Sequence, residues 1–147
     1  MRGIRALYRK AAEELAERLV AEPELHVNAV VLYGSVARGT ATKDSDVDVL
    51  IVCSQPDRIR TRVAEIEVDI DAVHGYYTWL TSMYYTPDQL EAVALKRFPF
   101  VSEVLREGIP LYDDGTYSRV RDEAFADGGR DAVGRQADGA KPPAKVR

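Results

Sequence analysis

The stretch "GSVARGTATKDSDVDVLIV", residues 34–52, decides how this sequence is interpreted. A Gly-Ser pair follows directly on the apolar run 27–33, and a second apolar run, 46–53, carries Asp46 and Asp48 at its start. Short runs rich in β-branched residues predict buried strands. Residues two apart on a strand face the same side, so we expect Asp46 and Asp48 to project toward one spot.

Three familiar motifs fail on this stretch. A P-loop needs Lys and then Ser or Thr after its second glycine, where this chain has Thr40 and Ala41. An EF-hand that starts at Asp44 needs Gly at its sixth position and Glu at its twelfth, where Val49 and Gln55 stand. The two residues after Gly34 also rule out a dinucleotide-binding G-x-G-x-x-G.

The residue types that remain suit a triphosphate. A strand that ends in Gly-Ser and turns into a short helical segment points backbone N–H groups at a phosphate, and the Ser35 hydroxyl adds a donor. Mg²⁺ is commonly held by one or two carboxylates together with nucleotide phosphates. The stretch therefore predicts a site in which the turn binds phosphate and the two aspartates bind metal.

The same residues resemble the signature of the DNA polymerase β type nucleotidyltransferase superfamily. Gly34-Ser35, ten further residues and Asp46-x-Asp48 before an apolar strand carry the resemblance, and Arg38-Gly39 agrees with it. The stretch is most similar to the minimal nucleotidyltransferase branch, whose members often act as antitoxins to HEPN-domain toxins. Weaker similarity in "YYTPDQLE" and "LREGIPLYDD" extends the resemblance over roughly residues 5–117.

The resemblance implies ATP as cosubstrate and Mg²⁺ as metal. Asp46 and Asp48 would be the catalytic metal ligands, Gly34 and Ser35 would bind the nucleotide, and Arg38 would pair with the γ-phosphate or with an acidic partner. In the antitoxin branch, AMP is transferred to a tyrosine hydroxyl of the HEPN toxin and blocks its ribonuclease site. Two alternatives stay open: a degenerate antitoxin that acts by binding alone, and transfer to a small molecule such as an aminoglycoside.

One departure from the superfamily concerns a third carboxylate, which commonly lies on a neighbouring strand. The expected strand "YYTWLTSMYY", 76–85, contains none. Residues 59–73 carry apolar side chains at helical spacing, yet 66–73 also alternate as a strand would before a hairpin at 74–75. We favour the helix; in the strand alternative, Asp71 or Asp69 would complete the site.

The order of elements predicts an α/β (α+β) fold, with a small mixed sheet flanked by helices. A helix is expected over 3–21, another from Thr86 through Lys96, a third from Pro99 to Gly108, and a last strand over 109–114. We expect residues 1–125 to form one nucleotidyltransferase domain. Residues 126–147 are Gly, Pro, Ala and charge, which predicts a disordered tail.

Composition narrows the class of protein. The chain of 147 residues is 46% hydrophobic and 30% charged with a net charge of −4, which favours a single globular domain and argues against an extended basic surface for nucleic acid. The lone Cys53 excludes an internal disulfide and is expected in the core. No run is long enough to span a membrane and the start is not a secretory signal, so we expect a cytoplasmic protein.

Overall fold

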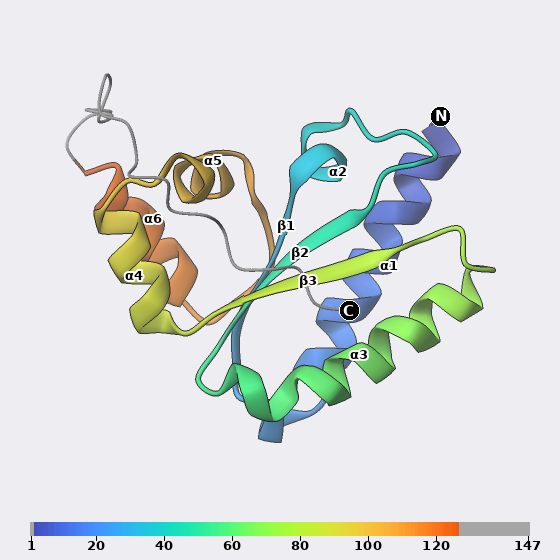
Figure 1. The fold of residues 1–147 in the computed structure, drawn as a ribbon, viewed down its shortest axis with the longest axis horizontal. Helices are drawn as coiled ribbons and strands as arrows, with labels where there is room; N and C mark the ends of the chain where they lie inside the picture. Colours follow the sequence, from blue (N-terminus) through green and yellow to red (C-terminus); the bar gives the residue numbers. More distant parts are fainter. Residues whose placement is uncertain (1, 127–147) are drawn as a thin grey trace.

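A four-stranded mixed sheet with helices on both faces forms the domain, as the computed structural model of residues 2–126 shows (Figure 1). The strand order is β3-β2-β1-β4, with β1 (Val27–Tyr33) antiparallel to both β2 (Val47–Cys53) and β4 (Ile109–Asp113). β3 (Leu80–Tyr85) pairs parallel with β2. The predicted mixed α/β architecture is confirmed.

Seven helical segments accompany the sheet within residues 2–126. They are α1 (Arg2–Val20), the 3₁₀ turn η1 (Pro23–Leu25), α2 (Gly34–Arg38), α3 (Pro56–Val73), α4 (Pro87–Leu95), α5 (Pro99–Glu107) and α6 (Thr116–Ala124). In this part of the chain, none of the helices combines the length and the apolar character needed to cross a bilayer.

The helices form two layers that bury both faces of the sheet. Helices α1 and α3 cover one face, and α4, α5 and α6 cover the other (Figure 1). Val49 and Ile51 of β2 point into the first layer, and Leu50 and Val52 point into the second. A strand with both faces covered needs apolar residues on both sides, which explains the unbroken apolar run 49–53 of β2 after Asp48. Cys53 is buried in the core, as predicted.

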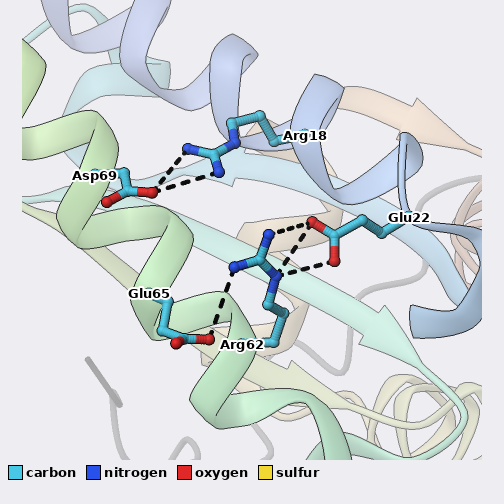
Figure 2. Close-up of polar contacts among 5 residues, drawn as sticks. All are labelled: Arg18, Glu22, Arg62, Glu65 and Asp69. Atoms are coloured by element: carbon cyan, nitrogen blue, oxygen red, sulfur yellow. Dashed lines mark hydrogen bonds and ion pairs between the residues drawn. The ribbon is translucent and has the colours of Figure 1, made fainter.

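Ion pairs link the exposed side of α3 to α1 and to Glu22, which follows α1. Arg18 lies 3.4 Å from Asp69, and Arg62 lies 2.7 Å from Glu22 and 3.7 Å from Glu65 (Figure 2). The hydrogen bond from Arg62 lowers the pKa of Glu22 below its ordinary value. Exposed pairs of this kind contribute about 1 kcal/mol or less each, so the two helices are held mainly by their buried apolar faces.

Residues 66–73 form a helix, so the strand alternative for them is wrong. They are the second half of α3, whose buried residues Ile59, Val63, Ile66 and Ile70 follow the helical spacing of the sequence. β2 and β3 run parallel, and a parallel pair needs a long crossover connection, usually a helix. A hairpin at 74–75 would have required an antiparallel pair.

The strand predicted over 76–85 begins only at Leu80. Residues 74–77 instead form a hydrogen-bonded turn, in which Tyr76 has a φ of 62°. β-branched and aromatic composition predicted the strand correctly, but it carries no information on where strand pairing starts. Pairing with β2 starts at Leu80, opposite Val47.

The C-terminal elements match the prediction up to β4. Thr86 and Gln89 form the predicted capping box of α4, with hydrogen bonds of 3.1 and 2.9 Å. Helix α6 was not predicted. Asp113 accepts hydrogen bonds from the backbone N–H groups of Tyr117 and Ser118 at its start, and Tyr117 is buried. The predicted disordered tail, 126–147, lies outside the described residues apart from Ala126.

Candidate active site

The Gly-Ser turn lies against the aspartate pair because β1 and β2 are neighbours. Gly34 follows the last residue of β1 and has a φ of +75°, a left-handed conformation that favours glycine. A Cβ atom at Gly34 would lie 2.5 Å from Oδ2 of Asp48. The glycine therefore serves two purposes: it allows the turn into α2, and it makes room for the carboxylate.

Asp48 lies in the middle of a row of residues on three strands. It pairs with Tyr33 on β1 and with Thr81 on β3. The Thr81 hydroxyl donates a hydrogen bond of 3.0 Å to Oδ1 of Asp48. One carboxylate oxygen is thus oriented by β3, while the other faces Gly34.

Asp46 precedes β2 and is exposed to solvent. Val47, between the two aspartates, is fully buried toward α1 and α3, so the extended chain directs Asp46 and Asp48 to the other face. Both negative charges add to the effect of burial in raising the pKa of Tyr33. The predicted convergence of the two aspartates agrees with this placement.

Helix α1 holds the loop between the turn and the aspartates. The Arg5 side chain donates to the carbonyl of Ala41 at 3.2 Å, and the Tyr8 hydroxyl donates to the carbonyl of Lys43 at 3.1 Å. Ala41 is fully buried and anchors the loop in the core. The loop therefore has a defined path, although its sequence is polar and rich in turn residues.

Arg38 forms ion pairs with α5. Its guanidinium lies 3.5 Å from Glu107 and 3.9 Å from Glu103, both on α5. In this arrangement Arg38 ties α2 to α5, and a role toward a phosphate would require it to exchange these partners.

Asp71 and Asp69 do not join the aspartate pair. Asp71 is fully buried on α3, where its carboxylate accepts hydrogen bonds from the Thr78 hydroxyl at 2.6 Å and from the backbone N–H of Leu80. Helix α3 packs on the sheet face opposite to the one that Asp48 faces. Since 66–73 is helical, the condition under which Asp71 would be catalytic is not met, and this assignment is corrected.

Metal-binding capacity rests on two carboxylates. Residues 2–126 contain no group of three or more His, Cys, Asp or Glu side chains that could hold a metal ion. Thr81 occupies the position on β3 that faces Asp48. Two carboxylates supplemented by phosphate oxygens fit Mg²⁺, whereas an all-protein cage for a metal is absent from the described part of the chain.

Two residues beside the pair were missed by sequence reasoning. Tyr33 is buried against Phe100, and its hydroxyl makes no hydrogen bond within residues 2–126. Thr81 contacts Asp48 directly. The position of Tyr33, immediately before the Gly-Ser pair, was a usable signal, but Thr81 could be found only once the register of β3 was known.

The site lies at the end of the sheet where β1 ends and β2 begins. Two hollows of about 470 and 510 Å³ lie elsewhere, the first beside the start of β1 and the second between α1 and β4.

A mixed sheet that brings a Gly-Ser helix start against a carboxylate of the adjacent strand defines a nucleotidyltransferase fold. Residues 9–108 match the nucleotidyltransferase domain family, and the chain belongs to this family. No curated protein sequence matches the chain.

Solved structures share the fold at low sequence identity. A crystal structure of a toxin–antitoxin with AMP-PNP matches with a TM-score of 0.50 at 14% identity, over 78% of this chain and 84% of that chain. A mutant of the toxin–antitoxin MntA–HpeT, with two aspartates exchanged for glutamates, matches with a TM-score of 0.52 at 12% identity over the same shares. Identity this low shows likeness of fold alone.

Proposed function

We propose that this protein transfers AMP from ATP to a tyrosine hydroxyl of a HEPN-domain toxin and thereby acts as its antitoxin. The contact between Gly34 and Asp48 carries the proposal, because it joins a phosphate-binding turn to a carboxylate pair. Membership of the nucleotidyltransferase domain family supports the reaction class. The partner class is supported by the two similar structures, which are toxin–antitoxin proteins.

The nucleotide assignment has two supports. One similar structure contains AMP-PNP, an analogue of ATP. The other carries changes at two aspartates two positions apart, which is the spacing of Asp46 and Asp48. We assign the triphosphate to the backbone N–H groups and the hydroxyl at Gly34-Ser35.

Asp46 and Asp48 would hold Mg²⁺, because carboxylate oxygens are hard ligands of the kind that this ion prefers. When bound, the ion would neutralise charge on the phosphates during transfer. The acceptor oxygen would form a bond to the α-phosphorus while the bond to pyrophosphate breaks, and the hydroxyl proton would leave to solvent or to the pyrophosphate.

A second candidate function is inhibition of the toxin by binding alone. Thr81 favours it, because this residue occupies the place beside Asp48 where a third carboxylate would serve as general base. AMP transfer requires Asp46 and Asp48 as metal ligands, whereas inhibition by binding does not. One experiment therefore separates the two functions.

The test mixes the full chain, a purified HEPN-domain toxin of the proposed partner class and α-labelled ATP with Mg²⁺. We expect label on a tyrosine of the partner with the wild type and none with the double variant Asp46→Asn, Asp48→Asn. If the double variant still silences the toxin equally well, binding suffices and the transferase role in neutralisation is lost.

A further inference from the structure

An exposed group of aromatic side chains lies between α3 and β3. Of the seven exposed large apolar side chains in residues 2–126, four fall in the short segment 73–79: Val73 at 79%, Tyr76 at 68%, Tyr77 at 74% and Trp79 at 51% exposure. We call Tyr76, Tyr77 and Trp79 the aromatic turn. Clustered exposed apolar side chains mark interaction sites.

Asp71 holds the aromatic turn in place through hydrogen bonds. The Asp71 carboxylate binds the Thr78 hydroxyl and the Leu80 N–H, and its carbonyl accepts from the N–H of Tyr76 at 2.7 Å. Tyr76 has a φ of 62°, which a bulky side chain rarely adopts. A buried carboxylate and a strained backbone thus present aromatic rings to solvent, which is preorganisation for binding.

The aromatic turn borders the aspartate pair on the side away from the Gly-Ser turn. The carbonyl of Trp79 accepts a hydrogen bond of 2.9 Å from the N–H of Val47. The register pairs Asp48 with Thr81 and Val47 with Leu80, and its continuation by one residue before β3 would bring Trp79 opposite Asp46. Gly34 approaches Asp48 from β1, on the other side. The phosphates therefore belong to the β1 side, and the β3 side is left for the acceptor.

An exposed carboxylate lies beside the aromatic turn. Asp46 precedes Val47, whose N–H binds the Trp79 carbonyl, and no ion pair joins Asp46 to a basic side chain within residues 2–126. An acidic margin around aromatic anchors favours a partner with a basic rim around an apolar patch.

We propose that the aromatic turn is the docking surface for the protein that supplies the acceptor hydroxyl, with Asp71 as its positioning residue. The proposal rests on the proposed function for the identity of that protein. A protein is favoured over the adenine base because three rings spread over a turn exceed what one base can cover. Aromatic residues that are rigid and exposed beforehand are typical energetic centres of protein interfaces.

Measuring how tightly the partner binds when no nucleotidyl transfer can occur tests the proposal. Titration calorimetry without ATP would compare the full chain and its Tyr77→Ala and Trp79→Ala variants in binding to a HEPN-domain toxin of the proposed partner class. We expect Kd to rise about tenfold for each variant and about a hundredfold for both together. In parallel, Kd for AMP-PNP with Mg²⁺ should stay within about twofold of wild type. Tyr77→Phe, which keeps the ring, should bind the partner as the wild type does.

Leu95→Ala is the matched control, because Leu95 is 66% exposed on α4, away from the aromatic turn. It should leave the Kd for the partner unchanged. The proposal is overturned if the partner does not bind the wild type, if Leu95→Ala weakens binding as much as Trp79→Ala, or if the turn variants lose AMP-PNP affinity alone. Failure of the transfer reaction with intact partner binding would instead refute the proposed function and leave the docking surface standing.

Discussion

The pattern Asp-x-Asp occurs at the start of β2 (Asp46 and Asp48, the strand copy) and within α3 (Asp69 and Asp71, the helix copy), and these two copies do opposite things. Asp46 and Asp48 flank the buried Val47 at the end of the sheet where β2 begins, where both carboxylates lie near the Gly-Ser turn. Asp69 and Asp71 flank Ile70 on α3, where one carboxylate pairs with Arg18 and the other is fully buried. The same spacing yields a candidate metal site in one place and a surface ion pair with an interior anchor in the other.

Backbone conformation accounts for the difference. Residues two apart on an extended strand face the same side, whereas on a helix they are about 200° apart around the axis. A strand can therefore offer two carboxylates to one cation, and a helix cannot do so at this spacing. The function of an Asp-x-Asp pattern depends on the secondary structure that carries it.

Substitutions in the strand copy, Asp46 and Asp48, should have the largest effect, and that effect is on transfer activity. In the double variant Asp46→Asn, Asp48→Asn, nucleotidyl transfer should fall by about 10³-fold, or about 4 kcal/mol, because amides no longer hold the metal. Loss of Mg²⁺-dependent AMP-PNP binding should accompany it, and both are measured with the full chain. The free energy of unfolding in urea should change by less than about 0.5 kcal/mol, because Asp46 is exposed and Asp48 lies at the edge of the core.

Asp69→Asn is the control for that variant, since it changes the charge of an exposed aspartate on α3. It should transfer AMP at the wild-type rate. Equal loss in both variants would mean that net charge, and not the paired carboxylates, governs the activity.

Substitutions in the helix copy, Asp69 and Asp71, should have the next largest effect, and that effect is on the free energy of unfolding. Asp71→Asn should lower the free energy of unfolding by about 2 to 3 kcal/mol, because it weakens the buried hydrogen bonds to Thr78 and Leu80. Asp69→Asn should lower it by less than about 0.5 kcal/mol, because the pair with Arg18 is exposed. Urea denaturation measures both, and similar losses would contradict the interior role of Asp71.

The role of the strand copy, Asp46 and Asp48, could be predicted from sequence because the residues around it indicate its secondary structure. The apolar run that follows "DVD" and the Gly-Ser pair upstream both agree with a strand that begins at a site. The helix copy was ambiguous, because apolar residues at 66, 68 and 70 satisfy the strand period while 59, 63, 66 and 70 satisfy the helical one. Only the parallel pairing of β2 and β3, a long-range feature, decides between them.

Residues that depend on register lay beyond the reach of the sequence. The contact of Thr81 with Asp48 and the hydrogen bond between Val47 and Trp79 follow from where β3 starts to pair. Helix α6 was missed because its apolar positions, Tyr117 and Val120, are few, although the Asp113 cap was a local signal for a helix start.

Gly34 provides a sharper test of the strand copy, with Gly39 as its matched control. Both glycines have nearly the same positive φ, +75° and +76°, but only a Cβ at Gly34 would collide with Asp48. Gly39→Ala should cost about 1 kcal/mol of stability from the backbone conformation alone, and Gly34→Ala about 2 kcal/mol. Transfer activity should fall steeply for Gly34→Ala and remain near wild type for Gly39→Ala. Equal behaviour of the two would show that the approach of the carboxylate is unimportant.

The smallest expected effect comes from substitution of Thr81, which tests whether its hydrogen bond orients Oδ1 of Asp48. Thr81→Val keeps the shape of the side chain and removes the hydrogen bond to Asp48, so transfer should fall by about fivefold, corresponding to about 1 kcal/mol. Thr81→Ser retains the hydroxyl and should stay near the wild-type rate. Steady-state rates at saturating ATP measure both. If Thr81→Val transfers AMP as fast as the wild type, β3 does not orient Asp48, and the packing of Gly34 alone fixes that carboxylate.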